Sequence, residues 1–396
     1  MPPSLHLNPP FRAEHIGSLL RPAQLISARL QHAEGKCSAE ALRALEDASI
    51  PAVVKLQQDA GIKTITDGEL RRGAFYEGMF EALGGMSVLP ARPLSTFKEY
   101  IPYVAIFQAM GLTEYTSIYC TSKIKRTKGV HTEDFKFLKT LVPPEDVKHI
   151  KVTICGPTWM HLRHGSEHTY DPTVYGSDAE YFADLIRAYR EEIEELYELG
   201  CRNVQFDDPT FAFFCAESMI AGMEQAGVDH EALLNMYISV YNDILQGRPE
   251  DLLVGLHTCR GNYRGMHYSE GGIDRIARQL FNDLNIDCYY LEYDTARSGG
   301  LEPLAHLPLN KVVVLGLVTT KSGEPESIAT LKARVEEAAE IIARGSPERS
   351  KADALNQLCL GPQCGFASVF EGNPITEEEE RRKLELVVGA ANAIWG

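Results

Sequence analysis

The chain has 396 residues, of which 39 are Lys or Arg and 55 are Asp or Glu, so the formal net charge is −16. Hydrophobic residues make up 44% and charged residues 24%, which excludes a disordered, collagen-like or low-complexity chain. The acidic balance argues against nucleic acid and anionic membranes as partners, because clustered Lys and Arg side chains bind both.

Nine cysteines are scattered along the chain. Their odd number and the lack of a signal-peptide pattern argue against a framework of disulfides. No apolar run is long enough to span a bilayer. We therefore expect a cytoplasmic protein whose thiols are buried, catalytic or bound to metal.

Short apolar runs alternate with amphipathic stretches along the whole chain. Most of the runs are rich in Val, Ile and Leu, as expected for strands that are buried on both faces. In chain order the predicted strands are Phe11–Ile16, Lys63–Thr66, Lys151–Cys155, Arg202–Phe206, Leu252–Leu256, Asp287–Glu292, Lys311–Leu317 and Gln357–Leu360.

Helical periodicity fills the gaps between these runs. The predicted helices are Ala39–Ala60, Ala179–Leu199, Ala232–Leu245, Ile273–Phe281, Glu326–Ala343 and Glu378–Ile394. Eight strands alternating with helices indicate an α/β fold of the (β/α)8 TIM barrel type. A doubly wound open sheet is the main rival, but no Gly-rich dinucleotide fingerprint follows the first strand.

One gap, 68–150, is too long for a simple connection between the second and third strands. Within it, Thr116–Lys125 alternates apolar and polar residues like a strand. We interpret 85–150 as an inserted hairpin and helix over one barrel mouth, so that 1–396 forms a single domain. Near the C-terminus, Thr376 and Glu379 form a capping-box pattern, which makes the acidic run after Pro374 a helix start.

Active residues of such barrels gather just after the carboxyl ends of the strands. Nearly every predicted strand here is followed by polar or metal-capable side chains. In chain order these segments are His15–Ser18, Asp67–Glu69, Gly156–Trp159, Asp207–Pro209, His257–Cys259, Glu292–Asp294, Thr319–Lys321 and Pro362–Gly365.

A candidate metal site lies among these strand ends. His257 and Cys259 are two residues apart, so in an extended chain both side chains point to the same side. With Glu292 and Cys364 they make a set of one imidazole, one carboxylate and two thiolates, which suits tetrahedral zinc. Buried, inert cysteines and a hydrogen-bonded histidine are the alternative, and the spacing alone leaves both open.

Other candidate ligands are weaker. His161, His164 and His168 have helical spacing, but Arg163 and Glu167 beside them favour a solvated or substrate-facing loop over a metal site. We expect Cys155, Cys288 and Cys359 to belong to the core.

Three carboxylates after strands have both structural and functional interpretations. Asp208 precedes Pro209, a pattern typical of a helix start. Glu69 and Asp207 end strands and are expected to face the barrel mouth, where they could hold a cationic group such as a substrate ammonium.

Taken in order, the motifs from His15-Ile16-Gly17-Ser18 to Pro362-Gln363-Cys364-Gly365 resemble the catalytic barrel of cobalamin-independent methionine synthase and its shorter relatives. The resemblance implies a (β/α)8 barrel with a catalytic zinc. It matches the zinc ligands to His257, Cys259, Glu292 and Cys364. It matches the residues that hold the amino acid group of homocysteine to Ile16, Ser18, Glu69 and Asp207.

The resemblance also implies a mechanism. Zinc binds the substrate thiol, lowers its pKa and keeps it as a thiolate, which attacks a methyl carbon in line. In the family the methyl donor is 5-methyltetrahydrofolate with a polyglutamate tail, and N5 of the folate must be protonated before it leaves.

Three departures from the family pattern concern the donor. The full-length synthase has a second barrel, and this chain has room for one. Where the synthase has a catalytic His after the seventh strand, this sequence has Lys321, which we take with Asp207 as a candidate catalytic residue. Arg163 stands where the synthase has a Trp that contacts folate, and Trp159 lies four residues earlier; both are candidate substrate-binding residues.

The leading hypothesis is a zinc-dependent S-methyltransferase of the methionine synthase class, which methylates a homocysteine-like thiol from a methyl donor such as methyltetrahydrofolate. The alternative is a thiol alkyltransferase that uses another electrophile, like the epoxide:coenzyme M transferases, with Lys321 or Arg163 near an anionic partner. A third hypothesis is a zinc-binding barrel without methyltransferase activity. The sequence leaves homo-oligomer formation open.

Overall fold

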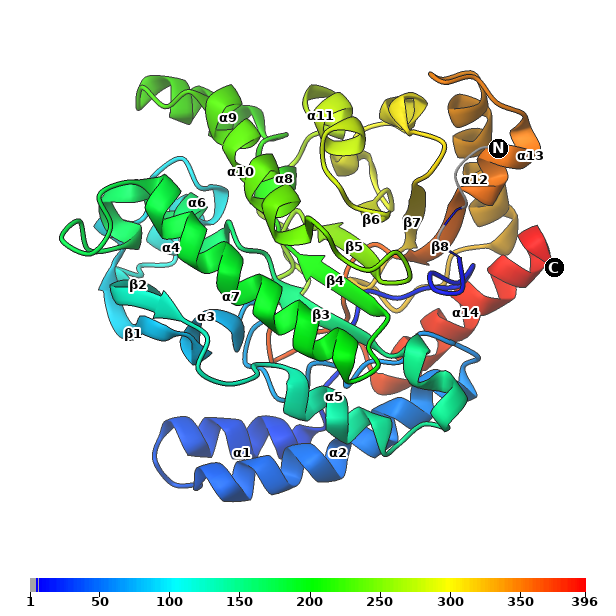
Figure 1. Cartoon of the computed structure of the whole chain (residues 1–396). Helices are drawn as coiled ribbons and strands as arrows, with labels where there is room; N and C mark the ends of the chain where they lie inside the picture. The colour runs from blue at the N-terminus through cyan, green and yellow to red at the C-terminus, as the bar shows by residue number, and fades with distance from the viewer. Residues whose placement is uncertain (1–4, 6) are drawn as a thin grey trace.

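A computed structural model of the chain describes residues 5 and 7–396. Its centre is a six-stranded parallel sheet in which neighbours along the chain are neighbours in space (Figure 1). Every residue of these strands is buried, as expected for strands covered on both faces. The strands are β3 (Lys151–Cys155), β4 (Asn203–Asp207), β5 (Leu253–Thr258), β6 (Cys288–Glu292), β7 (Val312–Val318) and β8 (Leu358–Pro362).

The first two predicted strands, 11–16 and 63–66, do not form regular ladders. Each makes one parallel bridge to an edge of the sheet: Ala13 pairs with Leu360 of β8, and Ile65 pairs with Ile150 just before β3. Side chains take the place of a ladder between the two segments, since Thr64 Oγ1 donates to Glu14 Oε1 over 2.5 Å. The prediction of two full strands is therefore wrong, but the segments occupy the first two positions of a (β/α)8 arrangement.

Five of the six predicted helices come between or after the sheet strands, and several shorter helices among them were not predicted. In chain order, the helices in these positions are α6 (Trp159–Thr169), α7 (Asp178–Glu198), α8 (Thr210–Phe213), α9 (Glu217–Gln225), α10 (His230–Leu245), η3 (Ile273–Arg275), α11 (Ala277–Asn282), η4 (Ala296–Ser298), η5 (Glu302–His306), α12 (Ile328–Ala343), α13 (Lys351–Asn356) and α14 (Glu377–Trp395). The predicted helix over 273–281 is split into η3 and α11. Helix α12 begins two residues later than predicted because Ser327 caps it, accepting from the Thr330 N–H.

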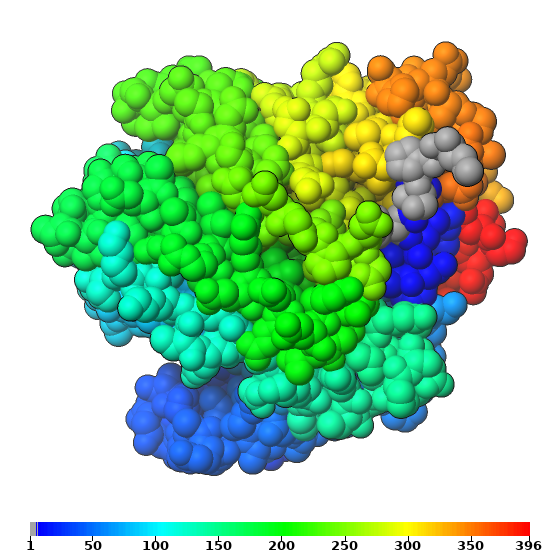
Figure 2. Space-filling model, in the orientation of Figure 1, coloured from blue at the N-terminus to red at the C-terminus, as the bar shows by residue number. Residues whose placement is uncertain are grey.

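The two ends of the described chain meet. Helix α14 begins with the predicted capping box, in which Thr376 and Glu379 bond reciprocally. Near its end, the Trp395 ring lies 5.2 Å from the Arg12 guanidinium. Figure 2 shows the N-terminal segment beside this C-terminal helix on one face of the molecule. Among the described residues, no helix is both long and apolar enough to cross a membrane.

Segments before β3 include a helical pair and a small second sheet. The pair, which projects below the sheet in Figure 1, consists of α1 (Ala23–Ala33), which was not predicted, and α2 (Ala39–Asp59). The small sheet pairs β1 (Gly84–Pro93) antiparallel with β2 (Glu114–Lys125). The two strands are not a tight hairpin, because η1 (Leu94–Thr96) and α4 (Pro102–Ala109) separate them. The remaining elements are α3 (Met79–Ala82), α5 (Thr132–Lys139) and η2 (Pro144–His149).

The expectation of a solvated loop around the three histidines is wrong. They lie on α6, where His161 and His164 are buried. His161 contacts the Tyr237 hydroxyl at 2.8 Å, and His164 contacts the Ser117 hydroxyl at 2.6 Å. They therefore fix α6 to its neighbours, and His168 alone of the three is exposed.

Candidate active site

The proposed metal ligands meet at one point beyond the carboxyl ends of the sheet. The ligand atoms of His257, Cys259, Glu292 and Cys364 all lie within 4.8 Å of one another, and all four residues are buried. The Cys259 and Cys364 sulfurs are 3.3 Å apart. Since β5 and β6 are neighbours and β8 ends at Pro362, the parallel register brings residues distant in sequence to the same edge.

The neighbouring strand β4 orients the histidine of this cluster. Asp207 pairs with His257 in the register of β4 and β5, so the two side chains lie on the same side of the sheet. His257 Nδ1 contacts Asp207 Oδ1 at 2.9 Å, and Gln205 Nε2 donates to the same carboxylate. His257 Nε2 is buried without a hydrogen-bond partner in the described structure. A carboxylate that fixes one ring nitrogen while the other is left free is typical of metal-ligating histidines.

The electrostatics of the cluster are those of closely packed acidic groups. The contact between the sulfurs lowers the pKa of Cys364 well below its ordinary value and raises that of Cys259, because one sulfur donates to the other. Burial opposes a charge on the His257 ring, but its contacts with Asp207 and Cys364 raise its pKa to about 10. A metal cation in place of these protons satisfies all of the groups at once.

Glu292 is the carboxylate of the cluster and is kept ionised by cations. Burial acts to raise its pKa, but the charges of Arg260, Arg297 and Lys321 lower it. Arg297 bridges Glu292 Oε2 at 3.1 Å and Asp294 Oδ1 at 2.9 Å. The Arg260 N–H donates to the other oxygen, Oε1, over 3.1 Å.

These four residues fit zinc. The set contains two thiols, one imidazole with a free nitrogen and one ionised carboxylate, a combination found at tetrahedral zinc sites. Zinc–sulfur bonds of about 2.3 Å place two tetrahedral sulfur ligands about 3.8 Å apart. A small separation of the Cys259 and Cys364 sulfurs from 3.3 Å is sufficient to accept the ion.

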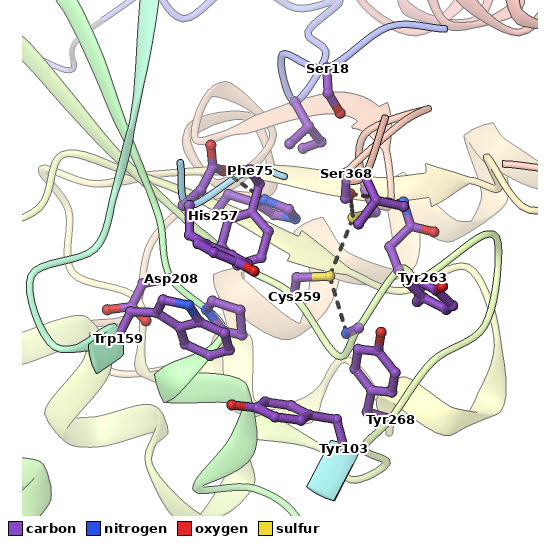
Figure 3. Close-up of a pocket in the computed structure, with 18 of the residues that line it drawn as sticks. Ser18, Phe75, Tyr103, Trp159, Asp208, His257, Cys259, Tyr263, Tyr268 and Ser368 are labelled. Atoms are coloured by element: carbon purple, nitrogen blue, oxygen red, sulfur yellow. Dashed lines mark hydrogen bonds and ion pairs between the residues drawn. The ribbon is translucent and has the colours of Figure 1, made fainter. Parts of the chain in front are cut away.

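A cavity opens directly onto the cluster. Its empty volume, counted out to open solvent, is about 800 Å³. It brings together most of the site residues predicted from the sequence, and Figure 3 shows several of them around Cys259. The predicted residues that line it are Ile16, Ser18, Glu69, Trp159, Asp207, His257, Cys259 and Cys364.

One corner of this cavity carries free carboxylate oxygens. Glu69 Oε2 and Asp207 Oδ2 are buried without hydrogen-bond partners among the described residues, although Thr153 donates to Glu69 Oε1. Burial raises the pKa of Glu69 to about 7. By contrast, Asp208 accepts from Thr210 N at the start of α8 and from the hydroxyls of Thr158 and Tyr241, so it is the turn residue expected before Pro209.

The two residues that depart from the family pattern lie outside the lining of this cavity. Lys321 Nζ donates to Gly261 O and Asn262 Oδ1, each over 3.1 Å, and so fastens the loop after β5. The Arg163 side chain is 1% exposed, and its Nε donates to the Tyr103 hydroxyl over 2.7 Å.

Apart from Trp159, the sequence did not reveal the aromatic wall that forms one side of the cavity. Its members come from the loop after the second barrel segment, the insertion, the loop after β5, and α6 and α8. One feature of the sequence could have indicated the wall. Two of the loops that supply its rings directly follow the predicted strand ends 67–69 and 257–259. The wall consists of Phe75, Tyr76, Tyr103, Phe107, Tyr115, Trp159, Phe213, Tyr263 and Tyr268.

The fold and the cluster define a class of protein, an α/β barrel with a buried group of one His, one Glu and two Cys residues at the carboxyl ends of its strands that could hold a metal ion. Comparison with known proteins identifies the family. The sequence pattern of the family described as "Cobalamin-independent synthase, Catalytic domain" matches residues 11–393. The chain therefore belongs to the cobalamin-independent methionine synthase family, as its motifs indicated.

Relatives of full length support this assignment. The uncharacterized protein YxjG of Bacillus subtilis is 36% identical over 389 residues, which covers 98% of this chain and 95% of that protein. A Listeria monocytogenes structure that carries the name of a vitamin-B12-independent methionine synthase superposes with a TM-score of 0.71 at 33% identity, covering 98% of both chains. A B12-independent methionine synthase of Shewanella sp. W3-18-1, in complex with selenomethionine, shares the fold at a TM-score of 0.67 and 19% identity, covering 97% of both chains.

Proposed function

We propose that this protein is a zinc-dependent S-methyltransferase that acts on a homocysteine-like thiol. One observation carries the proposal: the buried cluster of His257, Cys259, Glu292 and Cys364 opens onto a cavity whose far side is aromatic. The cluster supplies a place for a thiol sulfur, and the cavity supplies a place for the carbon that the sulfur attacks.

We expect the amino acid end of the acceptor to bind beside the metal cluster, at Glu69 and Asp207. The free oxygens of Glu69 and Asp207 are placed to receive the ammonium group of an amino acid thiol. Asp207 has a second task, because its other oxygen holds the His257 ring in orientation. When bound by the four ligand residues, zinc supplies a Lewis acid that keeps the substrate thiol deprotonated near neutral pH. The aromatic rings exclude water from the reacting atoms.

The charge of the cavity bears on the alternative function. An epoxide:coenzyme M type of reaction has an anionic thiol, for which a lining Lys or Arg is expected. Among the described residues that line the cavity there is neither, and the acidic residues there are Glu69, Asp207 and Asp208. This observation favours a thiol that carries an ammonium group.

A small electrophile tests the acceptor half without involving donor recognition. We expect the zinc-loaded protein to accelerate methylation of homocysteine by methyl iodide, with methionine as the product. Cys364→Ser should lose the acceleration, whereas Cys215→Ser, at a buried thiol outside the cluster, should retain it. A wild-type rate equal to that of free homocysteine would contradict the proposed function.

A further inference from the structure

The shape of the aromatic wall indicates which kind of methyl donor the cavity can bind. Four ring pairs around Trp159, those with Phe75, Tyr76, Tyr103 and Phe213, have centroid distances of 5.6–6.3 Å and interplanar angles of 39–56°. Rings this close pack against one another and leave a rounded space only on their cavity side, and these five form no parallel slot of the kind that a flat pterin stacks into.

The rounded space begins next to the metal cluster. Tyr268 lies close to Cys259 in Figure 3, and its ring centroid is 5.9 Å from that of Tyr103. A methyl group held within this wall thus faces the position of the acceptor sulfur. Several aromatic faces around one small volume are the usual means of binding methylated cations, because the face of each ring carries negative potential.

The charges on the side chains that line the cavity agree with a cation, although Arg163 lies behind the wall. The ionisable side chains that line it, apart from His257 and the two cysteines, are acidic or phenolic among the described residues. An adjoining groove shares Tyr76, Tyr115, Tyr263 and Val369 with the cavity and carries Glu77, Glu81 and Glu371. Its one arginine, Arg29, is paired with Glu46 at 2.6 Å. A polyglutamate tail would meet like charges along this path.

The leaving group gives an independent argument. A methylated tertiary amine such as methyltetrahydrofolate needs a proton before it can leave, but Lys321, at the position of the family's catalytic His, is held by Gly261 and Asn262 outside the lining. A sulfonium needs no proton. The new bond joins the acceptor sulfur to the methyl carbon. The bond from the methyl carbon to the donor sulfur breaks, and its electron pair stays on that sulfur, so the donor leaves as a neutral thioether.

From these observations we propose that the methyl donor is a small sulfonium ion, held with its methyl group in the aromatic wall beside Cys259 and Cys364. This inference rests on the proposed function. The indole Nε1–H of Trp159 is buried without an acceptor among the described residues, which leaves a place for one acceptor atom in the tail of the donor.

Arg163 provides the sharpest discrimination between donors. Its guanidinium lies 5.4 Å from the ring centres of both Tyr76 and Trp159 and 5.8 Å from that of Tyr103. A positive charge so close to the wall opposes a cationic donor and assists an anionic one. Removing the charge must therefore shift the KM values of the two kinds of donor in opposite directions.

The test supplies the zinc-loaded full chain with homocysteine and either trimethylsulfonium or 5-methyltetrahydrofolate triglutamate. We expect methionine and dimethyl sulfide in equal amounts from trimethylsulfonium, with competitive inhibition by tetramethylammonium. Methionine from the folate alone would overturn the inference. If methyl iodide is accepted and trimethylsulfonium is not, the donor inference fails while the proposed function stands; if neither reacts, both fail.

Variants of the wall complete the test. Trp159→Leu should raise the KM for trimethylsulfonium about tenfold. Arg163→Gln should lower that KM about threefold, and Arg163→Lys, which keeps the charge, should leave it near the wild-type value. Zinc content and circular dichroism verify that each variant is folded. A higher KM for trimethylsulfonium in Arg163→Gln than in Arg163→Lys, with both folded, would overturn the proposal.

Discussion

The metal half of the site and the donor half are built in different ways. The proposed ligands His257, Cys259 and Glu292 lie at the ends of adjacent parallel strands, and Cys364 lies just after the last strand of the sheet, so the ladder register fixes their separation. The donor half is assembled from loops, an inserted segment and the first turns of α6 and α8. A site set by sheet register keeps its chemistry, whereas a wall made of loop side chains can change its substrate without disturbing the metal.

Removing a ligand is expected to have the largest effect and to break the metal half alone. Cys259→Ser should lower methyl transfer roughly a thousandfold, because several kcal/mol of Lewis-acid stabilisation are lost. Zinc affinity should fall with it, while binding of tetramethylammonium to the wall persists. Titration with tetramethylammonium and a zinc chelator measures the two separately. Loss of both binding events in a folded variant would contradict the division into two halves.

The next largest effect is expected at Asp207, which holds the His257 ring in place. Asp207→Asn should weaken zinc binding about 10- to 100-fold, because the orientation of the His257 ring is no longer fixed by a charged partner. Asp208→Asn is the matched control. Asp208 is the next residue and is also buried, but its carboxylate accepts from Thr158, Thr210 and Tyr241 and not from His257. Competition with a chromophoric chelator gives both affinities. Equal losses in the two variants would show that Asp207 acts only through general burial.

Strand-end patterns together with the family resemblance predicted which four residues would meet, and the structure brings them together. His257 and Cys259 have strand spacing, and the strand ends that supply Glu292 and Cys364 are recognisable as buried apolar runs. The pairing of Asp207 with His257 was missed, because it depends on the register of β4 and β5 rather than on either run alone. Segments 11–16 and 63–66 were predicted as strands from their apolar runs. Such runs do not reveal that side-chain contacts replace the ladder between the two segments.

The donor half was predicted poorly for a physical reason. Tyr103 and Tyr115 lie in the insertion, and only tertiary packing brings them beside Trp159 and Phe213. Arg163 was expected to meet substrate because it aligns with a folate-contacting residue. Its guanidinium is instead buried behind the aromatic wall, and its Nε donates to the Tyr103 hydroxyl.

A change in the wall should have a moderate effect that is confined to the donor half. Phe213→Leu removes one face of the rounded space and is expected to raise the KM for the donor about threefold, in keeping with the strength of a single contact between a cation and an aromatic ring. The KM for homocysteine and the zinc content should stay at their wild-type values. Steady-state kinetics with each substrate varied in turn measures the split. A matching rise in the KM for homocysteine would place Phe213 in the acceptor half.

A substitution at Lys321 is expected to leave the choice of methyl donor unchanged. Lys321→His restores the residue type found in the synthases, but the side chain at this position fastens Gly261 and Asn262 and does not line the cavity. We therefore expect no gain in methionine formation from methyltetrahydrofolate triglutamate. A clear gain would show that position 321 reaches the donor, and the sulfonium inference would then lose one of its supports.

Glu380 lies outside both halves of the site, and its titration should affect the stability of the fold alone. Burial raises its pKa to about 8 from an ordinary value of 4.5, so the folded state holds a proton that the unfolded state releases. The free energy of unfolding should therefore fall as the pH rises from about 4.5 to 8. Glu380→Gln keeps an acceptor for Leu20 N and should reduce this fall, which urea titrations at several pH values measure. An unchanged pH profile would contradict the assignment, and methyl transfer should be unaffected.

The most direct test of the central claim is the metal content of the protein combined with X-ray absorption at the zinc edge. We predict one zinc per chain with two sulfur ligands, and three sulfur ligands after homocysteine is added. A folded wild-type protein without zinc would contradict the account, as would a zinc whose sulfur count does not change when homocysteine is added.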